Sequence, residues 1–124
     1  MKVLKCEKCG KMVCVIQNSG CPTICCGEPM TELVANTTDA AQEKHVPVFE
    51  TDGTTYKVRV GEADHPMTEE HHIAWIALEG KQGTQRKFLD HTGEPEATFA
   101  LAGGDEAIAV YAHCNLHGLW KADI

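Results

Sequence analysis

The chain has 124 residues, of which 43% are hydrophobic and 23% charged, and its formal net charge is −7 at neutral pH. This length suits one ordinary domain, or one small domain with a compact partner. The negative charge argues against a nucleic acid as the partner, because phosphate binding needs a basic face. No apolar run approaches the roughly 18 residues of a membrane-spanning helix, and the N-terminus has no signal-peptide pattern, so we expect a cytoplasmic protein that makes no use of a membrane.

The first 34 residues are rich in cysteine and poor in large apolar side chains. They contain six of the seven cysteines in the sequence. So short a segment cannot bury an adequate core and needs a staple. In a reducing cytoplasm, clustered cysteines are more often metal ligands than disulfide partners. We therefore predict that residues 1–34 form a small domain stapled by a metal ion.

Four of these cysteines have the spacing of a metal site. Cys6 and Cys9 are separated as in a metal-binding knuckle, whereas Cys25 and Cys26 are adjacent. Adjacent side chains diverge in an extended segment, so both reach one ion only if the backbone kinks there. Four sulfur ligands in a tetrahedron suit zinc or iron, and the competing interpretation is a disulfide or free thiols. Two further cysteines lack a partner at knuckle spacing and are expected to be free thiols: Cys14 and Cys21.

The rest of the chain has the pattern of short β-strands. A polar stretch at residues 35–44 is expected to be a linker. Beyond it, apolar and polar residues alternate or form short apolar runs, and glycine-containing turns separate the runs. We predict an antiparallel sandwich of about six or seven short strands, with no helix longer than two turns. Strands are assigned to residues 54–60, 71–79, 84–89, 96–102 and 107–113.

Histidines are concentrated near the ends of these strands, beside the last cysteine. Neutral imidazole and thiolate are good ligands for iron, zinc or copper. Strand alternation lets only one of His71 and His72 face a given centre, and the residues leave that choice open. Alternation along the last strand also directs the side chains of His113 and Cys114 to opposite faces. A turn after Cys114 can bring the side chains of Cys114 and His117 together. We expect His113 to lie behind the ligands or on the surface. One histidine in a turn is expected to face solvent: His91.

Five motifs, in chain order, resemble those of desulfoferrodoxin, the two-iron form of superoxide reductase. They are CEKCG at 6–10, CCGEPM at 25–30, EKHVP at 43–47, HPM at 65–67 with His71 after it, and CNLHG at 114–118. The resemblance covers essentially the whole chain. It implies a mainly β fold, with a desulforedoxin-like domain at 1–34 followed by an immunoglobulin-like antiparallel β-sandwich at 35–124. One departure is His72, a position that is often aromatic in relatives.

The resemblance also implies two iron ions per chain, each with its own ligands. Zinc is an accepted substitute in the first site, which would be formed by Cys6, Cys9, Cys25 and Cys26. The second site, with one of six positions open for substrate, would be formed by His45, His65, His71, His117 and the axial thiolate of Cys114. This selects His71 over His72. Glu43 is implied to cap the oxidised iron, and Lys44 to attract superoxide and help deliver protons; the competing interpretation is a solvated charge pair.

The activity implied by the resemblance is the one-electron reduction of superoxide to hydrogen peroxide without release of oxygen. It further implies an electron donor such as rubredoxin, and a homodimer. Two other functions remain to be compared with it. A rubredoxin-type electron-transfer protein would need no open coordination position, and a zinc-ribbon binding module would hold zinc only. The set of four histidines and one cysteine disfavours both.

Overall fold

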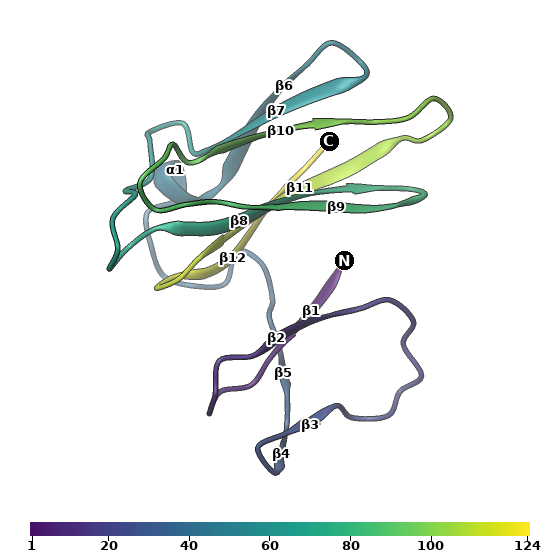
Figure 1. Ribbon diagram of the computed structural model, residues 1–124, viewed down its shortest axis with the longest axis vertical. Helices are drawn as coiled ribbons and strands as arrows, with labels where there is room; N and C mark the ends of the chain where they lie inside the picture. The colour runs from purple at the N-terminus through teal and green to yellow at the C-terminus, as the bar shows by residue number, and fades with distance from the viewer. The chain divides into compact units, whose positions relative to one another are not determined.

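The computed structural model describes residues 1–124, which divide into two compact units, Met1–Val34 and Ala35–Ile124. Both units consist almost entirely of β-strands and turns, and the chain contains a single four-residue helix (Figure 1). The predicted mainly β class with antiparallel sheets is confirmed. No helix is long and apolar enough to cross a membrane.

The first unit is a small antiparallel arrangement with little apolar core. Its three-stranded sheet has the order β2-β1-β5, and β3 and β4 form a separate hairpin. The strands are β1 (Lys2–Lys5), β2 (Met12–Val15), β3 (Ile24–Cys25), β4 (Glu28–Pro29) and β5 (Thr31–Glu32). Only three of its hydrophobic side chains are buried, namely Val3, Leu4 and Cys6. Such limited burial supports the expectation that the unit needs a staple.

The second unit contains two antiparallel sheets. One has the order β10-β7-β6 and the other the order β12-β11-β8-β9. Their strands are β6 (Pro47–Thr51), β7 (Thr55–Val60), β8 (Ile73–Gly80), β9 (Gly83–Phe88), β10 (Glu96–Ala100), β11 (Ala107–Cys114) and β12 (Gly118–Asp123). Five of these lie in the segments assigned from the sequence, but β8 begins at Ile73, so His71 and His72 precede the strand that was predicted to contain them. Two were not assigned: β6, which begins with a proline, and β12, which follows directly on the last ligand motif.

The inward-facing side chains of both sheets form the hydrophobic core. Alternation along β7 buries Tyr56, Val58 and Val60, and the intervening lysine and arginine are exposed, as the sequence pattern predicted. The opposing sheet contributes a buried stripe from β8 and β11. Cys114, with no exposed surface, is the last residue of that stripe. The hydrophobic core therefore extends as far as Cys114 at the end of β11.

The stretch 35–44, expected to be a polar linker, is in fact part of the second unit. Asn36 donates its backbone N–H to the carbonyl of Leu119, 3.0 Å away. Its side chain accepts from the backbone N–H of Lys121 at 2.8 Å and donates to the carbonyl of Lys121 at 3.0 Å. The stretch then enters the helix α1 (Gln42–His45), which precedes β6. Polar composition indicated solvent exposure correctly but gave no sign of these backbone contacts.

Three connections meet at one end of the sandwich because its strands are antiparallel. Register pairs Pro47 with Val60, and Cys114 both with Ile73 and with Gly118. The start of β6, the end of β7, the start of β8 and the β11–β12 turn therefore lie together. This end carries α1, the loop between β7 and β8, and the turn after Cys114.

Two side chains of β9 connect the sheets along one open edge of the sandwich. Gln85 donates its side-chain amide to the carbonyl of Ala100, 2.8 Å away. Lys87 donates its ammonium group to the carbonyl of Thr98, and the same ammonium lies 5.4 Å from the ring centroid of Phe99. Both acceptors belong to β10, the end strand of the other sheet.

Candidate metal centres

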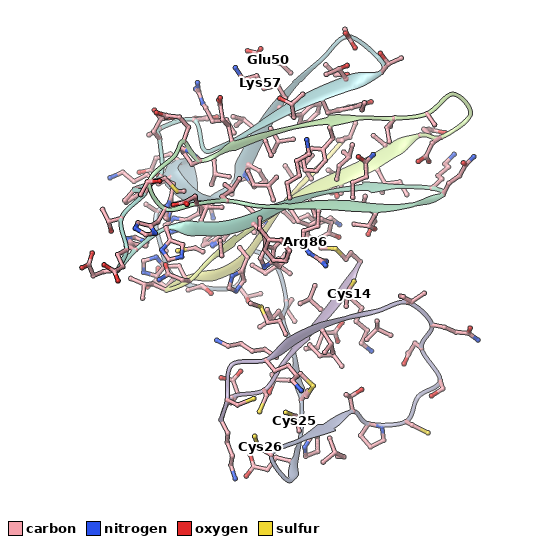
Figure 2. The ribbon with its side chains drawn as sticks, in the orientation of Figure 1. Cys14, Cys25, Cys26, Glu50, Lys57 and Arg86 are labelled. Carbon is pink, nitrogen blue, oxygen red and sulfur yellow. The ribbon has the colours of Figure 1, made fainter.

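The first unit brings four thiols together in what we call the four-cysteine cluster. Their sulfur atoms all lie within 4.8 Å of one another, and they belong to Cys6, Cys9, Cys25 and Cys26. Cys26 has a φ of 52°, in the left-handed region, where the β3–β4 hairpin turns. This is the kink that two adjacent ligands require. Figure 2 shows Cys25 and Cys26 at this hairpin and Cys14 apart from them on β2.

The spacing and ionisation of the four-cysteine cluster fit a bound cation. The sulfur atoms of Cys9 and Cys25 lie 3.6 Å apart, close to the roughly 3.8 Å between sulfurs that surround one ion tetrahedrally at about 2.3 Å. The backbone N–H groups of Cys9 and Lys8 lower the pKa of Cys6 to about 6. Hydrogen bonding with Cys9 and Cys6 raises the pKa of Cys25 to about 12. So close a set cannot all ionise unless a cation lies among them.

The second unit brings four imidazoles and one thiol together in what we call the histidine cluster. Ligand atoms within 4.8 Å of one another belong to His45, His65, His71 and Cys114. His117 adjoins them, with its Nδ1 3.0 Å from Nε2 of His45 and 3.9 Å from the sulfur of Cys114. His45 ends α1, Cys114 ends β11, and His117 lies in the turn that follows.

The four imidazole rings form a square. The centroid separations along its sides are 4.6 Å for His45–His65, 4.6 Å for His65–His71, 5.1 Å for His71–His117 and 4.9 Å for His117–His45. The separation of His45 from His71 across the square is larger, 6.3 Å. Neighbouring rings are nearly perpendicular, at 80° to 83°. Cys114 supplies a fifth donor atom, from the end of the buried stripe.

Hydrogen bonds on the outer side of two rings fix which nitrogen faces inward. His45 and His65 each place Nδ1 2.7 Å from a backbone carbonyl, of Ala41 and Pro66 respectively. Each Nδ1 therefore carries the proton, and each Nε2 presents a lone pair. These two Nε2 atoms lie 3.2 Å apart, near the roughly 3.0 Å between neighbouring ligands at about 2.1 Å from one octahedral ion. Two lone pairs cannot bond to one another, and a cation between them would satisfy both.

Burial disfavours protonation of three imidazoles in the histidine cluster, so these rings stay neutral. Desolvation lowers the pKa of His65 to about 4 and also lowers the pKa values of His45 and His71. Nε2 of His71 is buried and has no hydrogen-bond partner. Burial raises the pKa of the Cys114 thiol, whose sulfur accepts a hydrogen bond from the backbone N–H of His117 at 3.4 Å. Neutral imidazoles with an unpartnered inward nitrogen form a donor set that fits a metal ion.

The remaining histidines lie outside the cluster. His72 directs Nδ1 to the carbonyl of Thr68, 2.9 Å away, and its ring lies 6.0 Å from that of His91. The side chain of His91 is 42% exposed, in keeping with a turn residue. His113 is only 5% exposed and stacks on Trp75, with centroids 5.5 Å apart and planes at 10°. Its direction away from Cys114 agrees with strand alternation, but a surface position for it is ruled out.

The two charged residues before His45 are exposed. Glu43 and Lys44 occupy α1, and neither side chain joins the cluster. Sequence reasoning missed the indole of Trp120. Its Nε1 donates to the carbonyl of His117 at 3.1 Å, and its ring lies 4.9 Å from that of His45. The only sign of this contact in the sequence is that Trp120 is a large apolar residue two places after the CNLHG motif.

Fold and sites define a β-sheet protein with two clusters that could each hold a metal ion, one of four thiols and one of four imidazoles and a thiol. The family model for desulfoferrodoxin matches residues 37–123. Desulfoferrodoxin of Nitratidesulfovibrio vulgaris is 43% identical over 122 residues, covering 98% of this chain and 95% of that one. The superoxide reductase of Pyrococcus horikoshii is 38% identical over 99 residues, covering 66% of this chain and 86% of that one.

The solved structures give the same result. The crystal structure of the superoxide reductase from Treponema pallidum superposes with a TM-score of 0.80 at 40% identity, covering 97% of this chain and 98% of that one. The chain belongs to the desulfoferrodoxin family. This confirms the resemblance drawn from the five motifs.

Proposed function

We propose that this protein is a superoxide reductase, an enzyme that adds one electron and two protons to superoxide and yields hydrogen peroxide without releasing oxygen. The observation that carries the proposal is the square of four imidazoles with Cys114 as a fifth donor. Five donors leave one position of a six-coordinate ion for a small substrate. The names of the Treponema pallidum and Pyrococcus horikoshii relatives support the same activity.

We assign iron to the histidine cluster, held by His45, His65, His71, His117 and Cys114. When bound, this iron supplies the electron. The residues contribute charge and rigidity. Four neutral imidazoles and one thiolate carry a single negative charge, so much of the charge of a divalent cation stays uncompensated. That favours an anionic substrate at a site in a chain of net charge −7.

Glu43 and Lys44 are proposed as the catalytic residues beside this centre. Both precede His45 in α1 and reach solvent at the end of the sandwich that carries the cluster. The Lys44 ammonium is a compact charge with three donors, which suits attraction of superoxide and proton delivery to a substrate oxygen. The Glu43 carboxylate is proposed to cap the open position of the metal centre after the substrate has left.

The four-cysteine cluster is proposed to hold a second iron, with zinc as the alternative that the same ligands accept. A centre closed by Cys6, Cys9, Cys25 and Cys26 suits structure or electron transfer. We assign it to a desulforedoxin-like domain at residues 1–34 and the catalytic centre to a sandwich domain at residues 35–124. A donor such as rubredoxin, a homodimeric assembly and a cytoplasmic location complete the proposal.

One experiment tests the function directly. The purified, iron-loaded chain, with its iron reduced to the ferrous state beforehand, is mixed with a smaller amount of superoxide generated by a radiation pulse. Hydrogen peroxide and oxygen are measured alongside metal content. We expect about one peroxide per superoxide consumed, no oxygen from the reaction, and two irons per chain. Oxygen evolution would indicate dismutation instead. Rapid electron exchange with no superoxide consumption would favour an electron-transfer protein, and a colourless protein with zinc only would favour a binding module.

A further inference from the structure

Asn115 connects the segment just before β8, which carries His71, to the end of β11, where Cys114 lies and where the turn with His117 begins. Its side-chain oxygen accepts from the backbone N–H of His72 at 2.9 Å, and its side-chain amide donates to the carbonyl of Glu70 at 2.9 Å. Its own backbone N–H donates to the carbonyl of His72 at 3.1 Å. The three bonds hold the residues on both sides of His71, from a residue that directly follows Cys114.

His71 needs such support more than its neighbours do. The rings of His45 and His65 are each oriented by a bond from Nδ1 to a carbonyl. The ring of His71 has no such bond, and its buried Nε2 has no partner. The direction of this ring therefore depends on its backbone and on its contacts with the rings of His65 and His117.

That backbone is held on its other side by a local turn. Thr68 accepts a hydrogen bond from the N–H of His71 at 3.1 Å through its hydroxyl oxygen, and its own backbone N–H donates to the carbonyl of His71 at 2.9 Å. This turn fixes the local shape of the segment, since both partners belong to it. The β8–β11 ladder holds the chain to β11 only from Ile73 onward. Asn115 extends that connection to the residues on both sides of His71.

We propose that Asn115 is a positioning residue that fixes the imidazole of His71 relative to the thiolate of Cys114, and so sets how tightly the histidine cluster holds its metal ion. The proposal deepens the proposed function and rests on it for the identity of the ion. Asn115 itself touches neither the ion nor the substrate. Its effect passes through the backbone at Glu70 and His72. Outer partners of metal ligands commonly change metal affinity about 10- to 100-fold when removed.

The chain contains a matched control in Asn36. Its backbone N–H and both side-chain groups make the same three kinds of bond to β12, at Leu119 and Lys121, and it is exposed like Asn115. Leu119 and Lys121 flank Trp120, which packs on His45 but supplies no donor atom to the cluster, whereas Glu70 and His72 flank the donor residue His71 itself. Asn36 has a φ of 63°, so alanine there adds backbone strain to the loss of three bonds. Asn36→Ala should therefore destabilise the fold at least as much as Asn115→Ala.

The test compares Asn115→Ala, Asn115→Asp and Asn36→Ala in the full chain. Before metal loading, amide exchange at His72 should accelerate in Asn115→Ala, which loses the acceptor of that N–H, and not in Asn36→Ala. After iron loading, the rate of iron loss to a chelator should rise about 10-fold or more in Asn115→Ala, and the thiolate-to-iron absorption band should shift. Asn115→Asp keeps the acceptor for the N–H of His72, so its rate of iron loss should lie between those of the parent and Asn115→Ala. Asn36→Ala should lower the unfolding temperature and leave the band and the iron loss as in the parent.

The inference is overturned if Asn115→Ala and Asn36→Ala lose the same stability and release iron at the same rate with unchanged spectra. It is equally overturned if His72 exchange is unaffected. Failure of the proposed function has a different signature. A parent chain that binds the ion but does not reduce superoxide would contradict the activity, while the difference between the two asparagine variants would still measure positioning.

Discussion

The backbone of Gly61 lies directly against the carbonyl group of Glu43. A Cβ atom at position 61 would lie 2.7 Å from that oxygen and 2.9 Å from the carbonyl oxygen of Val46. Both are backbone atoms of α1 and its end, so no side-chain rotation can relieve the overlap. Gly61 therefore determines how closely the helix that carries His45 approaches the loop that carries His65.

Gly61→Ala should displace α1 and weaken the histidine cluster. We expect lower metal content at the second centre and a loss of stability of about 1–3 kcal/mol, the usual range for an overpacked site. Metal analysis and thermal unfolding measure the two effects. Gly103→Ala is the control, because nothing lies within 4 Å of its Cβ and its φ is not positive. Equal behaviour of the two variants would show that α1 is not held by this contact.

Cys114→Ser should abolish the thiolate-to-iron absorption band and most superoxide reduction. The sulfur is fully buried, and a serine hydroxyl in the same place is a poor replacement for a soft thiolate ligand. Absorption spectroscopy and the rate of superoxide consumption measure the change. Cys14→Ser, at an exposed thiol of β2, should change neither. A Cys114→Ser protein with the parent spectrum would exclude this thiol from the ligand set.

Cys9→Ser should remove the first centre and leave superoxide reduction in place. The two clusters share no residue, and each belongs to one compact unit. Metal content should fall by one ion per chain, with the spectrum and rate of the second centre kept. If the second iron is also lost, the two centres depend on one another.

Lys44→Ala should keep the iron and its colour but lower the rate of reaction with superoxide about 3- to 10-fold at low ionic strength, since one steering charge is lost. The salt dependence of that rate should flatten as well. Lys81→Ala removes the same charge from an exposed pair with Glu106, whose atoms lie 2.6 Å apart, and controls for net charge. Equal rates for Lys44→Ala and the parent at low salt would contradict the steering role.

The turn between β6 and β7 should make stability depend on pH through Asp52. Backbone N–H groups of Thr55 and Thr54 donate to its carboxylate and hold the pKa of Asp52 below its ordinary value of 3.8. A depressed folded-state pKa stabilises the fold above the unfolded value, and that contribution disappears as pH falls through the folded value. Parent and Asp52→Ala should therefore differ most above pH 4, and the part of the difference due to charge should vanish in stronger acid. Chemical unfolding across pH measures it; a difference independent of pH would assign the effect to hydrogen bonding alone.

The sequence was sufficient where periodicity or spacing carries the information. Alternation around Val58 predicted β7, and alternation at the end of β11 separated His113 from Cys114. It could not choose between His71 and His72, because either parity was available until the motifs were compared with a known family. The ligand assignments themselves stay predictions until the metals are measured.

Contacts between distant backbone groups could not be predicted from the sequence. Asn36 and Asn115 resemble ordinary loop residues. Nothing local shows that Asn36 bonds to β12 or that Asn115 bonds to the segment before β8. Gly61 is equally inconspicuous, since its role depends on a helix that approaches it from an earlier segment. The sequence also left His113 either behind the ligands or on the surface, because its stacking partner Trp75 lies on a different strand.

The contacts of Gln85 and Lys87 with β10 have a consequence for how molecules of this protein meet one another. An end strand with free carbonyl groups is a template on which a strand of another chain can pair, and such pairing is a common start of aggregation. Here the carbonyls of Thr98 and Ala100 already accept hydrogen bonds from the chain's own β9. The ammonium of Lys87 also places a charge at the same edge, which a foreign strand would have to desolvate. A strand of another molecule could pair along β10 only by displacing both of these side-chain hydrogen bonds.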